Sequence, residues 1–106
     1  MKQYDIKLKK QPQKYLIKAD GITQKKLIKA LDGLRVLKGD IIKLKNSDCY
    51  RLKIPQYRII YERDDVIRII SVEEINTRTN INYGRYSKWT LLKKELQIHQ
   101  WLNLTK

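Results

Sequence analysis

The sequence predicts a single α+β domain, in which an N-terminal strand and a helical hairpin pack on a small antiparallel sheet and an extra helix follows. Three observations favour this fold class. Apolar residues recur with helical spacing in the first third of the chain, alternate with polar residues in the middle, and return to helical spacing at the end. The length of 106 residues suits one hydrophobic core. We therefore expect residues 1–106 to form one domain.

The N-terminal region predicts a strand and two helices. Residues Tyr4 to Leu8 alternate between apolar and charged side chains, which is typical of a half-buried strand. A first helix is expected from Pro12 to the break at Asp20-Gly21. A second is expected from Thr23, its N-cap, to a point before Gly39. The apolar stripe of the second helix is Leu27, Ile28, Leu31 and Leu34, opposite Lys25, Lys26 and Lys29.

The central region predicts three antiparallel strands. After a turn at residues 38–40, the segment from Cys49 to Ile54 alternates, with Arg51 and Lys53 on its polar face. The expected strands cover residues 49–54, 57–61 and 66–72, joined by turns at Pro55-Gln56 and Asp64-Asp65. Beyond Asn76 the pattern weakens. A last helix is then expected over residues 87–106, with Trp89, Leu92, Leu96 and Trp101 along one side.

The chain is strongly basic, and its charge is unevenly spread. The formal net charge is +13. Residues 1–46 hold thirteen basic and four acidic side chains, residues 84–106 hold five and one, and residues 47–83 hold six of each. A protein of this charge is expected to meet an acidic partner, such as nucleic acid, an anionic membrane or an acidic protein. Because the central strands are neutral in sum, a site there depends on where individual charges lie.

The composition argues against several classes of protein. No apolar run approaches the roughly 20 residues of a membrane span, and the first residues lack the apolar middle of a signal peptide, so a cytoplasmic protein without a membrane partner is expected. Cys49 is the single cysteine, and the single histidine, His99, is fifty residues away. These two residues provide no set of metal ligands. We therefore expect no disulfide, metal or other cofactor, and a metal-free mechanism if the chain is an enzyme.

Three basic side chains are expected to converge on one face of the central sheet. If Pro55-Gln56 is a two-residue turn, Lys53 lies directly opposite Arg58, and Arg51 projects from the same face. Like charges in opposite positions destabilise a sheet by roughly 0.2–1 kcal/mol, so a chain selected for stability alone would avoid this pair. Such a cluster binds phosphate and can stabilise the transition state of a phosphoryl transfer. An ordinary solvated strand face is the alternative interpretation.

A second group of candidate residues follows the last strand. Arg78 is followed by Tyr83 and Tyr86. An arginine here can complete an anion site, and a tyrosine can stack on a base or handle a proton. For each tyrosine alone, a structural role is the alternative.

The order of elements and the segment DCYRLKIPQYRIIYERDDVIRIISV resemble the RelE/ParE toxin superfamily, and more specifically RelE-type messenger-RNA interferases. The resemblance covers about residues 4–86, and residues 44–72 are its most specific part. It implies the toxin of a bacterial or phage type II toxin–antitoxin system, which enters the ribosomal A site and cleaves messenger RNA there. In that family the RNA 2′-hydroxyl attacks the adjacent phosphate without a metal, and basic residues on the sheet stabilise the transition state.

The resemblance also implies catalytic roles for Arg51, Lys53, Arg58, Arg78 and Tyr83. Arg51 and Lys53 match two basic positions on the strand after Asp-Cys-Tyr, and Arg58 matches the arginine between a tyrosine and two apolar residues. Arg78 is similar to the arginine after the last strand, and Tyr83 to the tyrosine that acts as a base. Arg51 stands where a lysine is often found, which favours an electrostatic role because a guanidinium stays charged. The spacing after Arg78 leaves Tyr86 as the alternative tyrosine.

Three functions remain open from the sequence. The first is the ribosome-dependent endoribonuclease, whose partners are the ribosome and messenger RNA. The second is a ParE-like protein that poisons DNA gyrase, and the third is a non-catalytic RNA-binding module. Both toxin functions imply an acidic antitoxin that folds over the basic chain and silences it.

Overall fold

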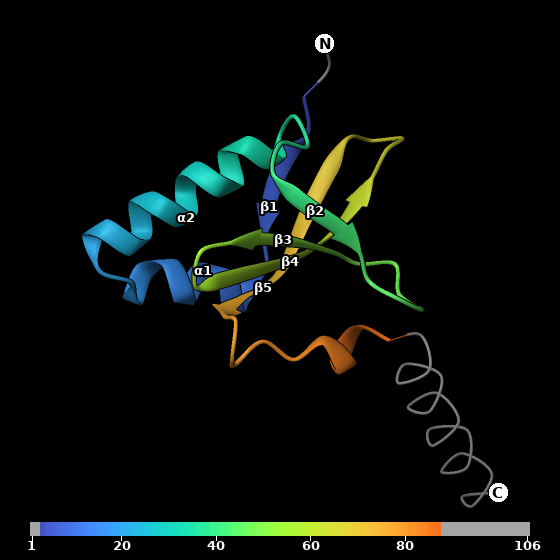
Figure 1. The fold of residues 1–106 in the computed structure, drawn as a ribbon. Helices are drawn as coiled ribbons and strands as arrows, with labels where there is room; N and C mark the ends of the chain where they lie inside the picture. The colour runs from blue at the N-terminus through green and yellow to red at the C-terminus, as the bar shows by residue number, and fades with distance from the viewer. Residues whose placement is uncertain (1–2, 88–106) are drawn as a thin grey trace, which may run out of the picture.

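The computed structural model describes residues 3–87, which form a five-stranded mixed sheet with two helices packed on one face (Figure 1). The strand order is β1-β5-β4-β3-β2, with β1 parallel to β5 and the other neighbours antiparallel. The elements are β1 (Asp5–Leu8), α1 (Lys10–Lys18), α2 (Gly21–Leu34), β2 (Asp40–Lys43), β3 (Tyr50–Ile54), β4 (Tyr57–Asp64), β5 (Ile69–Thr77) and the 3-10 helix η1 (Tyr83–Tyr86). The α+β class is confirmed. The predicted last helix and His99 lie outside the described residues.

Both helices begin earlier than the sequence predicts. Because α1 starts at Lys10, the buried Pro12 falls in its first turn, where the missing N–H has no intrahelical partner to lose. The prediction of Thr23 as N-cap is wrong. Asp20 is the cap of α2, and its carboxylate accepts a hydrogen bond of 2.7 Å from the Thr23 amide, which lowers the pKa of Asp20. An aspartate cap also places negative charge at the positive end of the helix.

The strand β2 corrects the sequence analysis, which expects only a turn at residues 38–40. Its residues DIIK do not alternate, and all are exposed or half-buried, so the pattern carries no strand signal. Pairing with β3 forms the strand and sets Asp40 opposite Lys53. The same pairing sets Ile42 opposite Arg51 at the edge of the sheet.

The hairpin between β3 and β4 follows the prediction. Ile54 pairs with Tyr57 across a two-residue turn, and Gln56, which follows proline in that turn, has the positive φ, 68°, that a type II turn requires at this position. Lys53 therefore lies directly opposite Arg58, as expected.

The last strand is longer and begins later than the predicted residues 66–72. The Asp64 carboxylate accepts hydrogen bonds from the amides of Val66, at 2.9 Å, and Ile67, at 3.1 Å. These bonds hold the two residues in a turn despite their strand propensity. The strand β5 starts only at Ile69 and continues to Thr77.

A β-bulge in β5 changes which side chains face the helices. Ile60 pairs with Glu74 and Tyr61 pairs with Val72, so Glu73 is an extra residue without a partner position on β4. Val72 faces the core before the bulge. After it, Glu74 points to the opposite face, whereas strict alternation would place Glu74 beside Val72.

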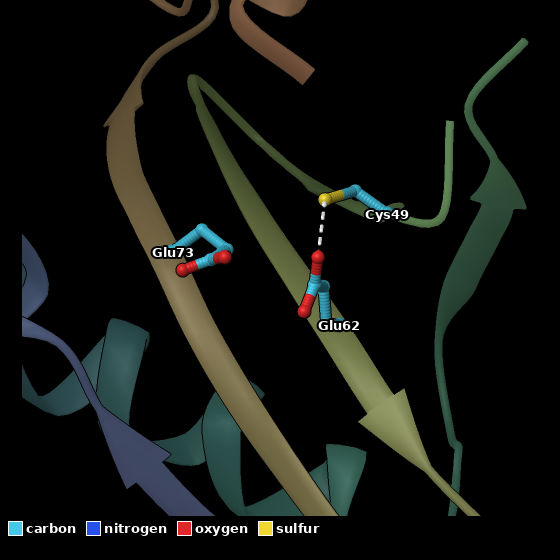
Figure 2. A group of neighbouring side chains, drawn as sticks. All are labelled: Cys49, Glu62 and Glu73. Carbon is cyan, nitrogen blue, oxygen red and sulfur yellow. Dashed lines mark hydrogen bonds between the residues drawn. The ribbon is translucent and has the colours of Figure 1, made fainter. Parts of the chain in front are cut away.

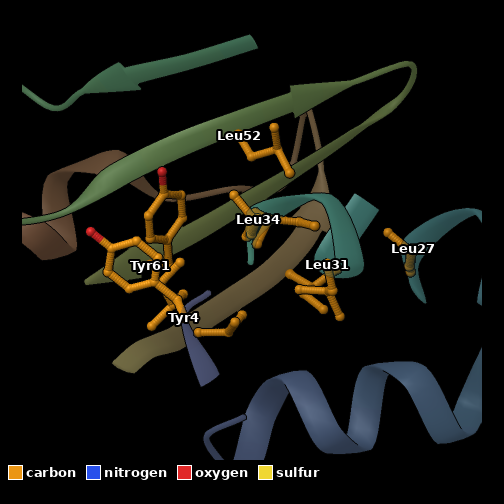
Figure 3. Packing of buried hydrophobic residues seen from close by; sticks show 10 residues of the cluster. Tyr4, Leu27, Leu31, Leu34, Leu52 and Tyr61 are labelled. Carbon is orange, nitrogen blue, oxygen red and sulfur yellow. The ribbon is translucent and has the colours of Figure 1, made fainter. Parts of the chain in front are cut away.

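The hydrophobic core lies between the helices and one face of the sheet (Figure 3). Helix α2 contributes Leu27, Leu31 and Leu34. The sheet contributes Leu52, Ile59, Tyr61, Ile70, Val72 and Ile75, and Tyr4 is added from the residue before β1. Helix α1 is fastened to this layer by the Gln11 amide, which donates to the Ile75 carbonyl at 2.7 Å and accepts from the Ile75 amide at 2.9 Å. Within residues 3–87, no helix is long and apolar enough to cross a membrane.

Candidate functional site

The face of the sheet opposite the helices, here called the open face, carries the predicted basic residues in two rows. The first row runs across Arg51, Ile60 and Glu74. The second row runs across Lys53, Arg58 and Asn76. Since Leu52, Ile59 and Ile75 lie between these rows and are buried on the helix side, alternation sends both rows to the open face.

The Lys53–Arg58 pair lies at the hairpin end of the open face. Arg58 Nη1 donates to the carbonyl oxygens of Ile54, at 3.0 Å, and Tyr57, at 2.8 Å. These bonds hold the half-buried guanidinium against the turn and fix its position. Lys53 is exposed on the neighbouring strand. A fixed guanidinium beside an exposed ammonium group suits a negatively charged ligand.

Arg51 is held by an acidic residue that the sequence analysis did not connect with it. Its Nη2 lies 3.3 Å from Asp40 Oδ1, and the Arg51 side chain is only 17% exposed. The Nε of Arg51 is buried and has no hydrogen-bond partner within residues 3–87. The aspartate is found only once β2 is known, because β2 brings Asp40 beside β3.

Arg78 is brought to the hairpin end by its backbone. Its amide donates to the carbonyl of Gln56 at 3.0 Å, which joins the chain after β5 to the turn between the strands of Lys53 and Arg58. Tyr83, the other predicted residue of this region, begins η1 and is 40% exposed. The backbone thus collects Arg78 with two predicted residues at one end of the sheet.

Tyr86 and Glu74 form a contact on the open face that the sequence analysis missed. The Tyr86 hydroxyl donates to Glu74 Oε1 at 2.5 Å, and Glu74 is only 3% exposed. Asn76 Nδ2 donates to the other oxygen of Glu74 at 3.2 Å, and Arg85 Nη1 lies 4.0 Å from Oε1. Burial, together with the hydrogen bond to Glu74, raises the pKa of Tyr86 far above its usual value. The sequence signal for this contact was the pair of adjacent acids, Glu73 and Glu74, directly after the largely apolar residues 69–72.

A second acidic group lies further along the open side, around Cys49 (Figure 2). The Cys49 Sγ donates to Glu62 Oε1 at 3.8 Å. The thiol and one carboxylate oxygen each from Glu62 and Glu73 all lie within 4.8 Å of one another. Lys9 Nζ neutralises Glu73 at 2.7 Å. Burial raises the pKa of the Cys49 thiol to about 11, which disfavours the thiolate that binds metals.

Comparison with known proteins finds similarity in structure alone. No protein-family model and no curated protein sequence matches the chain. The archaeal RelE–RelB complex from Pyrococcus horikoshii OT3 contains a chain that is 26% identical, with a TM-score of 0.62 over 76% of this chain and 100% of that one.

Two further solved structures agree with this match. A free arginine-to-alanine double mutant of the Escherichia coli toxin RelE is 18% identical, with a TM-score of 0.60 over 80% of this chain and 94% of that one. The RelBE2 toxin–antitoxin complex from Mycobacterium tuberculosis gives 16% identity and a TM-score of 0.60 over 72% of this chain and 99% of the matched chain.

The fold and the open face define a class of small α+β proteins, in which a helical hairpin covers one face of a sheet and basic residues occupy the other. Within this class, the chain has a RelE-type fold. The resemblance inferred from its sequence is confirmed at the level of the fold.

Proposed function

We propose that the chain is the toxin of a type II toxin–antitoxin pair and cleaves messenger RNA in the ribosomal A site without a metal ion. The observation that carries the proposal is the placement of Lys53 directly opposite Arg58 on a RelE-type fold. This pairing of like charges costs stability, so its presence calls for a ligand with negative charge. The net charge of +13 supplies a field that attracts ribosomal RNA.

The open-face cations have different tasks in this reaction. The RNA 2′-hydroxyl gives its proton to a base, which the resemblance identifies as a tyrosine, Tyr83 or Tyr86. Its oxygen forms a bond to phosphorus while the bond from phosphorus to the 5′-oxygen breaks, which leaves a cyclic phosphate and a 5′-hydroxyl. Arg58 and Arg51 stabilise the negative charge of the transition state, because a guanidinium stays charged and can hold two oxygens. Lys53 gives a proton to the departing 5′-oxygen, since an ammonium group can lose one. Arg78 adds a further cation at the hairpin end, where its backbone amide donates to the Gln56 carbonyl.

Primer extension on translating ribosomes tests the proposal. Wild-type protein is expected to produce new messenger ends within A-site codons, and Arg58→Ala is expected to abolish them. Arg63→Ala is the matched control, because it removes the same charge from the same strand while its guanidinium lies over the Tyr50 ring at 4.8 Å, away from the open face. Intact messenger with wild-type protein refutes the nuclease function. Gyrase-dependent DNA breaks in that case select the ParE-like alternative.

An acidic antitoxin is the second part of the proposal. A groove of about 560 Å³ lies between α2 and β3. Its floor includes Ala30, Leu52 and Ile54, and its basic residues are Lys26, Lys29, Arg35, Lys38 and Lys53, against the single acid Asp32. An apolar floor with a basic rim suits an acidic amphipathic segment, which would cover Lys53 as it binds.

Binding measurements with the acidic product of a neighbouring gene test this partner. The double variant Lys26→Glu and Lys29→Glu is expected to weaken binding at least about tenfold, because each reversed charge repels an acidic segment. Lys14→Glu with Lys18→Glu changes the charge equally on α1, outside the groove, and serves as the control. Equal losses in both double variants would show that net charge, and not the groove, decides affinity.

A further inference from the structure

Glu74 is a buried carboxylate in the middle of a face that should attract anions. It lies in the same cross-strand row as Arg51, with Ile60 between them. A buried charge is costly unless hydrogen bonds compensate it. Glu74 contacts Tyr86 at 2.5 Å, Asn76 at 3.2 Å and Arg85 at 4.0 Å, and all three follow it in the chain.

These contacts connect Glu74 to the proposed cleavage site. Asn76, which bonds to one oxygen of Glu74, is the position directly opposite Arg58. Tyr86 bonds to the other oxygen and thereby fixes the end of η1 on the open face. Tyr86 remains partly exposed, whereas Glu74 does not. Part of the Tyr86 side chain therefore faces solvent, whereas the carboxylate that it contacts is buried.

We propose that Glu74 is a positioning residue which receives the phenolic proton of Tyr86 during the reaction, where Tyr86 is the alternative tyrosine that the resemblance offers for the base. The inference rests on the proposed ribonuclease function and deepens it. The 2′-hydroxyl gives its proton to Tyr86 Oη while Tyr86 gives its own proton to Glu74, so that the 2′-oxygen attacks phosphorus and Glu74 ends protonated. Lys53 protonates the departing 5′-oxygen. Glu74 then loses its proton to solvent, and Lys53 regains one.

The environment of Tyr86 explains why a carboxylate is needed. A tyrosine can act as a base by itself only as a phenolate. Burial and the hydrogen bond to Glu74 raise the pKa of Tyr86 well above its usual value, so the phenol stays neutral at physiological pH. A neutral phenol moves a proton only if a second group accepts the proton it already holds. Glu74 Oε1 accepts the hydrogen bond through which that transfer passes.

Single-turnover cleavage of an A-site codon on programmed ribosomes tests the inference. Tyr86→Phe and Glu74→Gln are each expected to lower the maximal cleavage rate by about 100-fold and to leave the half-saturating ribosome concentration unchanged. Glu74→Asp, which keeps an acceptor, should retain more activity than Glu74→Gln. Glu73→Gln is the matched control: it removes the neighbouring charge from the same strand and is expected to stay near the wild-type rate.

The possible outcomes separate this inference from the function on which it rests. An inactive wild-type protein overturns both. An active wild-type protein with Tyr86→Phe within about threefold of it overturns only the role of Tyr86 and Glu74. A rise in half-saturating concentration at an unchanged maximal rate also overturns it, because this indicates binding. If Glu74→Gln unfolds, Tyr86→Phe decides, since it removes one oxygen atom and the thermal midpoint shows that the fold is kept.

Discussion

The two faces of the sheet are built from alternate residues of the same strands, yet they treat polar groups differently. The helix-side face is filled by apolar side chains such as Leu52 and Ile59, which contact the core residues of α2. The open face instead carries cations on the neighbouring positions of the same strands. The guanidinium groups of Arg51 and Arg58 contact carboxylate and carbonyl oxygens there. Burial stabilises the first face. The second uses hydrogen bonds to fix the positions of charges, and this division predicts which substitutions unfold the chain and which inactivate it.

The adjacent residues Arg58 and Ile59 give the largest test of this division. Ile59→Ala is expected to lower the free energy of unfolding by about 2–5 kcal/mol, because it empties a fully buried position. Arg58→Ala should lower that free energy by only about 1 kcal/mol while reducing cleavage about 100-fold or more. Urea unfolding and primer extension measure the two effects. Equal destabilisation by both variants would contradict a division between the faces.

Gly39 tests the segment that connects α2 to β2, the edge strand of the sheet. Its φ is +129°, and an added Cβ would lie 2.6 Å from Leu52 Cδ1. Gly39→Ala should therefore lower the free energy of unfolding by about 1–3 kcal/mol. At Gly21, an added Cβ meets nothing within 4 Å, so Gly21→Ala should leave stability unchanged or raise it by up to about 1 kcal/mol. A thermal melt that lowers both midpoints equally would argue against the steric explanation.

Asp40 tests the electrostatics of the open face alone. Asp40→Asn releases Arg51 from its ion pair and should tighten binding of single-stranded RNA about two- to fivefold at low salt. The affinity should also fall more steeply with added salt. Asp32→Asn removes the same charge from the helix side and is the control. Equal tightening in both variants would show that only net charge matters.

Cys49 gives a test outside the two faces, a dependence of stability on pH. Burial raises the pKa of its thiol from 9.0 to about 11 in the folded chain. The folded state therefore holds this proton more tightly, and the stabilisation is complete below pH 9 and lost as the pH rises towards 11. Urea midpoints of wild type and Cys49→Ala at several pH values isolate this contribution. Parallel pH profiles of the two proteins would contradict it.

Local patterns predicted the parts of the site that depend on neighbouring residues. Alternation assigned Arg51 and Lys53 to one face, and the two-residue turn fixed the register that sets Lys53 opposite Arg58. The backbone hydrogen bond between Arg78 and Gln56 could not be predicted from local patterns, because it joins segments that only the folded sheet brings together. Whether these residues catalyse cleavage stays a prediction.

The missed parts depend on the partners that a segment meets. The strand β2 exists because β3 pairs with it, and its sequence has no alternation to reveal it. Asp40 was consequently placed in a turn and not beside Arg51. The role of Glu74 was missed for a different reason. Strict alternation from Val72 assigns Glu74 to the core, and the sequence does not reveal the bulge that reverses this assignment.

The bulge at Glu73 works as a change of reading frame within the strand. Before the bulge, even-numbered residues such as Val72 face the helices, and after it odd-numbered residues such as Ile75 do. One additional amino acid therefore exchanges the two faces of the sheet for every residue of the strand that follows it. Insertion or deletion of a single residue at this point would exchange Glu74 and Ile75 between the open face and the helix-side core. A proton acceptor can thus enter or leave such a site through a change in length, with no change in the side chain itself.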